Sequence, residues 1–159
     1  MSDEKVLARI TASTPRRFLG VGMLVFLGGL LIYMAFAAPP SLLWQACLLG
    51  FGAGSVWFAM VMYRATETEL ELTETELRDT AGIVLAYIAD VQKVDRGAFA
   101  LKPSNGFTLT MNRPQARCWR PGLWWRLGRR VAVGGVTSGA LTRPVADVIA
   151  TIIAQRDQP

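Results

Sequence analysis

Hydrophobic residues are concentrated in one uncharged stretch near the start of the chain. Residues 18–63 contain no Asp, Glu, Lys or Arg, and Pro39 and Pro40 divide them into two pieces, 18–38 and 42–63. A helix needs about 20 apolar residues to cross the hydrocarbon layer of a bilayer, and each piece is that long. The pattern therefore predicts a transmembrane helical hairpin with a tight turn at the two prolines.

Basic residues flank this predicted hairpin. Residues 1–17 form a polar arm in which Arg16 and Arg17 directly precede the first helix, and Arg64 follows the second helix. Short flanks rich in Lys and Arg remain in the cytoplasm, so both chain ends are expected there. The alternative is a signal peptide cleaved near residues 35–37, but the apolar run is longer than the usual hydrophobic segment of such peptides.

Small residues recur along the second predicted helix. Gly50 and Gly54 stand four positions apart, and Ser55 and Ala59 repeat that spacing. Small side chains let helix backbones approach closely. We expect these four residues to pack against the other helix of the hairpin or, alternatively, against a helix of another membrane subunit.

After Arg64 the pattern changes to the two-residue period of strands. Alternating segments and short apolar runs predict about seven strands, and Asn105-Gly106 predicts a turn. The predicted strands cover residues 68–73, 75–80, 83–88, 107–111, 116–119 and 130–133, and residues 91–99 are expected to form another strand or a short irregular connection.

An amphipathic helix is predicted at the end of the chain. Apolar residues recur at helical spacing from Val145 to Ile153, with Thr142 as the N-cap and Pro144 in the first turn. Residues 64–159 are therefore expected to form a small, mostly-β α+β domain that ends in one helix.

This order of elements resembles the pleckstrin-homology-like fold, a barrel of about seven strands capped by a C-terminal helix. The segments that carry the resemblance are residues 70–77, 88–91 and 131–134. Bacterial membrane proteins often carry such a domain after one or two transmembrane helices, so the resemblance implies a multi-pass protein of the bacterial cytoplasmic membrane. It also implies a binding or scaffolding role and brings no catalytic residues.

Charge is divided unevenly over the predicted domain. Residues 64–101 carry eight acidic and four basic side chains, whereas residues 102–143 carry eight basic and no acidic ones. Within the basic part, residues 119–130 contain three Trp and four Arg among Pro and Gly breaks, which predicts an exposed loop. Arg attracts anionic headgroups, Trp suits the membrane interface, and both recur at protein–protein hot spots. The residues expected to contact a membrane or a partner are Arg117, Trp119, Arg120, Trp124, Trp125, Arg126, Arg129 and Arg130.

A structural role is the alternative for the same stretch. Trp119 would then point into the barrel, Trp124 or Trp125 would cap it, and the arginines would pair with the acidic half of the domain. Stacking of aromatic and Arg side chains on nucleic-acid bases is a further use of such residues, but it does not suit a membrane-tethered domain.

Candidate catalytic and metal-binding residues are scarce. The chain has no His, its two cysteines, Cys47 and Cys118, are far apart, and it contains no phosphate-loop or nucleophile motif. We therefore expect no enzymatic activity, no cofactor and no metal. The expected function is scaffolding or assembly of a larger membrane complex, with a homo-oligomer as one form of it. The alternative function is binding or sensing of anionic lipids.

Overall fold

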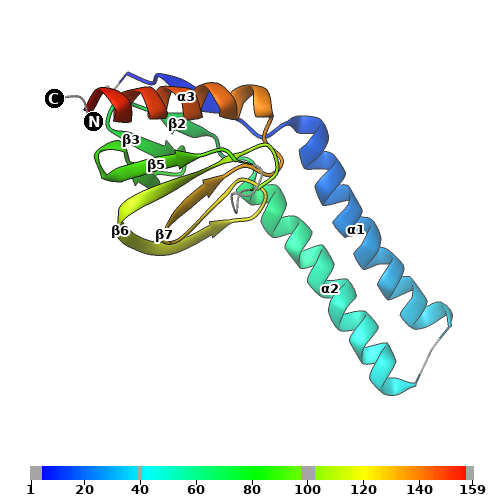
Figure 1. Ribbon diagram of the computed structural model, residues 1–159. Coiled ribbons are helices and arrows are strands. Elements are labelled where there is room, and N and C mark those ends of the chain that lie inside the picture. Colours follow the sequence, from blue (N-terminus) through cyan, green and yellow to red (C-terminus); the bar gives the residue numbers. More distant parts are fainter. Residues whose placement is uncertain (1–4, 39–40, 98–102, 157–159) are drawn as a thin grey trace. The chain divides into compact units, whose positions relative to one another are not determined.

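The computed structural model describes residues 5–38, 41–97 and 103–156. Residues 14–64 form one compact unit, and the segments on either side of them together form a second. The elements, labelled in Figure 1, are β1 (Ala8–Ile10), α1 (Thr14–Ala37), α2 (Leu42–Ala65), β2 (Leu70–Leu72), β3 (Glu76–Asp79), β4 (Val84–Tyr87), the 3-10 helix η1 (Ile88–Asp90), β5 (Val91–Asp95), β6 (Phe107–Arg120), β7 (Trp124–Val133) and α3 (Gly139–Arg156).

The first unit consists of α1 and α2, and both helices are long and apolar enough to cross a membrane. The prediction of two such helices is confirmed, although α1 begins four residues earlier than predicted, at Thr14. The guanidinium of Arg17 lies 4.1 Å from the centre of the Tyr63 ring and donates a 3.0 Å hydrogen bond to the Tyr63 carbonyl. These contacts join the first turn of α1 to the end of α2. The predicted turn at Pro39 and Pro40 lies outside the described residues.

Close packing of the two helices depends on Gly28 and Gly52. A methyl group on Gly28 would lie 2.6 Å from Val56 Cγ2, and one on Gly52 would lie 2.7 Å from Ile32 Cγ1. Gly50 and Gly54 behave differently, because a methyl group on either would have no neighbour within 4 Å among the residues that the structure describes. The expectation that these two glycines pack inside the hairpin is therefore wrong.

Ser55 and Ala59 lie on another side of α2 from that pair. Ala59 is buried and Ser55 is half-buried, whereas Gly50 and Gly54 are exposed. The four-residue spacing that links Gly50 to Gly54 and Ser55 to Ala59 thus describes two different faces. Only the face of Ser55 and Ala59 is covered in the structure.

The second unit contains two antiparallel sheets and α3. The first sheet has the strand order β1-β2-β3-β4, and the second has the order β5-β6-β7. The prediction of a small, mostly-β domain with a C-terminal helix is confirmed, and the described residues hold seven strands. No strand ladder joins the two sheets within the described parts of the chain.

Two of the predicted strands form one, and one strand was not predicted. Residues 107–111 and 116–119 both belong to the long strand β6. The additional strand, β1, lies before the helical unit, in the segment that the sequence suggested to be only a polar arm. It pairs antiparallel with β2, so that Ile10 is opposite Leu70. The strand predicted around residues 91–99 ends at Asp95, and its last residues lie outside the described part.

The long hairpin of β6 and β7 is strongly bent. Its register shifts between Thr110 and Gln115, opposite Gly128, whose φ of 57° lies in the left-handed region. Because of the bend, the hairpin turn comes back to the end of β7, where the Gly134 amide donates a 2.9 Å hydrogen bond to the Leu123 carbonyl. Most of residues 119–130 are therefore strand, and the prediction of an exposed loop there is wrong.

Helix α3 completes the hydrophobic core with the predicted apolar stripe. Val145, Ile149 and Ile153 of that stripe, together with Ala146, are buried against side chains of both sheets, and Val148 and Ile152 are partly buried beside them. The predicted start of the helix is wrong, because the helix begins at Gly139 and the Ser138 hydroxyl accepts a hydrogen bond from the Ala140 amide. The Thr142 hydroxyl instead donates a 2.6 Å hydrogen bond to the Asn105 carbonyl and joins α3 to the turn before β6.

Candidate functional site

The two faces of the β6–β7 hairpin next to its turn carry different side chains. Trp119 is opposite Trp125 in the register, and Arg120 is opposite Trp124. Successive side chains on a strand point to opposite faces, so these pairs lie on different sides of the hairpin. Trp119 is 61% exposed and Trp124 is 1% exposed. The hypothesis that Trp119 points into the barrel is therefore wrong, and Trp124 is the buried tryptophan.

Trp124 is held by a buried carboxylate. Its indole Nε1 donates a 3.3 Å hydrogen bond to Asp79 Oδ2, and the Thr68 hydroxyl donates to the same oxygen at 3.2 Å. The Ala81 amide donates to Asp79 Oδ1, and Arg120 Nε lies 3.9 Å from Oδ2. A buried carboxylate needs such partners, because its charge is costly to remove from water. Trp124 and Arg120 thus have structural roles, although both were predicted as contact residues.

Arg126 connects the two sheets. Its Nη1 donates a 2.7 Å hydrogen bond to the Val84 carbonyl on β4, and its Nε donates a 2.7 Å bond to the Ala116 carbonyl on β6. Val84 lies on β4, the last strand of its sheet, and Ala116 lies between the paired residues Gln115 and Cys118 of β6. Arg126 was also predicted as a contact residue, but its guanidinium is directed at the protein's own backbone.

The outer face of the hairpin forms a hydrophobic patch with basic residues beside it. We define the outer patch as Arg117, Trp119, Trp125 and Leu127; Leu127 is 50% exposed. Together with Cys118 and Arg126, these residues line a shallow depression of about 500 Å³. Leu127 was not among the predicted contact residues. The sequence pattern that could have identified Leu127 is the two-residue spacing of Trp125, Leu127 and Arg129, which is typical of one face of a strand. The prediction of a loop hid this pattern.

Exposed arginines of the hairpin have no acidic partner. Arg113, Arg117, Arg129 and Arg130 are all exposed, and no ion pair or hydrogen bond of their side chains is found within residues 5–38, 41–97 and 103–156. Residues 107–133 contain no Asp or Glu. The acidic half of the domain thus leaves this positive charge largely unbalanced.

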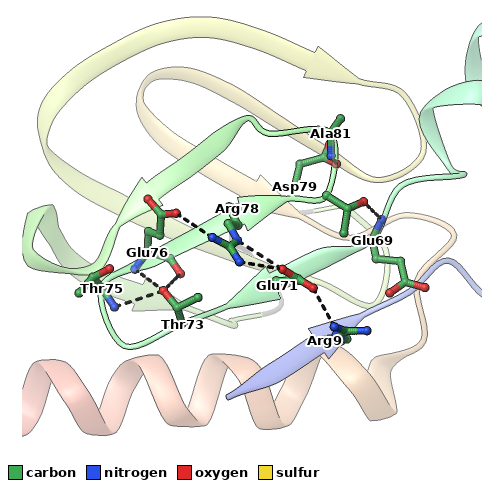
Figure 2. Close-up of polar contacts among 10 residues, drawn as sticks. Arg9, Glu69, Glu71, Thr73, Thr75, Glu76, Arg78, Asp79 and Ala81 are labelled. Atoms are coloured by element: carbon green, nitrogen blue, oxygen red, sulfur yellow. Dashed lines mark hydrogen bonds and ion pairs between the residues drawn. The ribbon is translucent and has the colours of Figure 1, made fainter. Parts of the chain in front are cut away.

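Glu71 and Glu76 of the first sheet pair instead with arginines of that same sheet. Glu71 lies 3.0 Å from Arg9 Nη2 on β1 and 3.2 Å from Arg78 Nη2 on β3, as Figure 2 shows. Arg78 also lies 3.7 Å from Glu76. Among the described residues, the hypothesis that hairpin arginines pair with the acidic half of the domain holds only for Arg120, which lies near Asp79.

The hairpin turn is hydrogen-bonded to segments that lead into the helical unit. Val136 donates a 3.0 Å hydrogen bond to the Gly122 carbonyl and accepts a 2.8 Å bond from the Ser13 amide. Ser13 directly precedes α1, and Thr68, a partner of Asp79, lies three residues after the end of α2.

Arg129 and Arg130 lie farther along β7, at the bend. The predicted contact residues are thus divided between the turn and the bend.

In the part of the chain that the structure describes, no group of three or more Cys, Asp or Glu side chains is placed to hold a metal ion. No protein-family model, no curated protein and no solved structure matches the chain.

Proposed function

We propose that this chain is a non-enzymatic integral membrane protein whose sheet domain scaffolds, or helps to assemble, a larger membrane protein complex. The observation that carries the proposal is the exposed outer patch, where Trp119 and Leu127 lie beside Arg117, which has no ion-pair partner among the residues that the structure describes. Exposed apolar side chains of this size, grouped together, are typical of interaction surfaces. Trp and Arg are the residue types most enriched at binding hot spots.

Two further features support a membrane-anchored, pleckstrin-homology-like protein. The domain has sheets of four and three strands with a C-terminal helix, and Arg126 links β4 to β6 across the gap between these sheets. The helical unit carries Arg16 and Arg17 at its start and Arg64 at its end. Basic residues at both ends favour a cytoplasmic location for both termini, in the cytoplasmic membrane of a bacterium.

The experiment is purification of a tagged full-length chain from gently solubilised native membranes, followed by mass spectrometry. We expect other membrane proteins to be recovered in fixed ratio to the chain. Leu127→Ser and Gly54→Leu then show which surface holds them, and Tyr87→Ser is the matched control because Tyr87 is another exposed large side chain, 50% exposed. Recovery of the chain without any partner protein contradicts the scaffolding proposal.

Binding of anionic lipid is the second candidate function. It is favoured by the four exposed arginines of the hairpin that have no acidic partner in the described residues. Each basic residue near an anionic membrane surface contributes about 1 kcal/mol of attraction. Recovery of the chain with anionic lipid alone would support this second function.

A further inference from the structure

We propose that the outer patch rests on the anionic headgroup layer of the membrane that α1 and α2 cross. Lipid would then cover Trp119 and Leu127, and partner proteins would use other surfaces. The inference rests on the proposed membrane anchoring and deepens the second candidate function by naming the surface that contacts lipid. Because the scaffolding proposal uses the same outer patch, lipid and a partner protein compete for this surface. It is supported by chain connectivity, by charge and by side-chain chemistry.

Chain connectivity limits how far the patch can lie from the membrane-crossing helices. Ser13 directly precedes α1, and Thr68 follows α2 by three residues, so each lies within about 10 Å of a helix end. Ser13 reaches the hairpin turn through Val136, and Thr68 reaches Trp124 through Asp79. Trp119 and Trp125 are the first register pair beyond the buried pair at that turn. Within the sheet domain, the patch therefore lies near Ser13 and Thr68, the two residues through which the hydrogen bonds reach the ends of this domain's chain segments.

Charge favours lipid over a generic protein partner. The hairpin carries no acidic residue, and Arg117 within the patch has no ion-pair partner in the described chain. The positive charge at the helix ends, from Arg16 and Arg64, has the same sign. An anionic bilayer attracts all of these groups together, and the attraction falls off within a Debye length of the surface.

Side-chain chemistry and shape also fit a bilayer surface. Trp is suited to the headgroup region because its large ring is apolar while its N–H is polar. Arg places its charged end among headgroups while its methylene groups cover apolar surface. The depression between these side chains is shallow and mostly apolar, and it is too open to enclose a single ligand. Such a shape suits contact with a planar, fluid bilayer surface.

The test uses the full chain in nanodiscs of phosphatidylcholine alone or mixed with phosphatidylglycerol. Brominated acyl chains quench tryptophan fluorescence, and the difference between the natural chain and Trp119→Phe isolates the signal of Trp119 from that of the helix tryptophans. We expect Trp119 to be quenched in the anionic nanodiscs, and high salt to reverse much of that quenching. Absence of quenching in the anionic nanodiscs overturns the proposal.

A matched pair of charge variants locates the effect. Arg117→Gln and Arg129→Gln remove the same charge, but Arg117 belongs to the outer patch, whereas Arg129 lies outside it on β7, past the bend at Gly128. We expect Arg117→Gln to lower about fivefold the ratio of sheet domains whose outer patch contacts the membrane to those whose patch does not. This is the change for one basic residue near an anionic surface. Arg129→Gln should have a smaller effect, and equal effects of the two variants contradict seating through the outer patch.

Photocrosslinking in native membranes separates this proposal from the scaffolding role. A benzophenone amino acid at position 119 should give lipid adducts. Protein adducts there overturn the lipid proposal and assign the patch to a partner, while the purification experiment independently decides whether a complex exists.

Discussion

Glu71 in the first sheet lies between two arginines, whereas Arg117 in the second sheet has no acidic neighbour among the described residues. Strand register makes the difference, because it places Arg9, Glu71 and Arg78 opposite one another on three adjacent strands. The β6–β7 hairpin has no acidic residue to offer such a pairing. The first sheet therefore neutralises its own surface, and the hairpin presents charge to its surroundings.

The same contrast exists within the hairpin itself. Trp124 and Arg126 are used to hold the domain together, whereas Trp119 and Arg117 face outward. Residue types that the sequence suggests to be one contact surface thus have two different roles. Variants of matched residues are the way to separate these roles.

The largest effect is expected for the buried tryptophan. Trp124→Ala should lower the free energy of unfolding of the sheet domain by about 3–5 kcal/mol, because it leaves a cavity and removes a partner of Asp79. Trp119→Ala should change that free energy by no more than about 0.5 kcal/mol, as is usual for exposed positions. Guanidinium titration of the full chain in detergent measures both values, and similar losses in the two variants would contradict the assignment of their faces.

The glycines of the helical unit offer the next comparison. Gly52→Leu should weaken the packing of α1 on α2 by about 1–3 kcal/mol, because even a methyl group there would lie 2.7 Å from Ile32 Cγ1. Gly54→Leu should leave that packing unchanged, because a methyl group there would meet no atom of α1 within 4 Å in the described part of the chain. Spin-label distances between the exposed positions 33 and 51 in nanodiscs should broaden only for Gly52→Leu. Broadening for both variants would show that Gly54 also lies in the helix contact.

A smaller effect is expected for the arginine between the sheets. Arg126→Ala leaves the Val84 and Ala116 carbonyls without their donor and should cost about 1–3 kcal/mol of unfolding free energy. Arg129→Ala removes an exposed charge and should cost no more than about 0.5 kcal/mol. The same denaturant titration applies, and an unchanged midpoint for Arg126→Ala would refute its bridging role.

The smallest effect is expected in the ion pairs of the first sheet. The Arg9 side chain is 60% exposed, so Arg9→Gln should cost only about 0.2–1 kcal/mol despite the 3.0 Å contact with Glu71. The cost should shrink at high salt because ions screen exposed charges. A salt-independent loss would show that Arg9 stabilises β1 through packing instead of charge.

Periodicity revealed most of the fold in advance. The uncharged stretch predicts both long helices. Alternation predicts β2, short strand-like segments predict β3 and β4, and the region of β5 was expected to be a strand or an irregular connection. The amphipathic stripe gave α3. These elements bury one face, so their sequences carry the corresponding period.

The sequence concealed the elements that depend on tertiary contacts. β1 has only three residues, and its partner β2 is separated from it by the whole helical unit. Strand β6 looked like two strands because its bend exposes residues 112–114 in the middle. The Trp and Arg stretch resembled a loop because it contains Gly122 and Gly128. In the structure these glycines mark only a turn and a bend within strand.

The distinction between structural and available arginines is tested most directly by chemical modification. Phenylglyoxal reacts with accessible guanidinium groups, and mass spectrometry of the full chain in phosphatidylcholine nanodiscs gives the rate at each residue. We predict fast modification of Arg117, Arg129 and Arg130 and slow modification of Arg126, whose donors are engaged by backbone carbonyls. Equal rates at Arg117 and Arg126 would contradict the division of the hairpin into a structural inner face and an outer contact face.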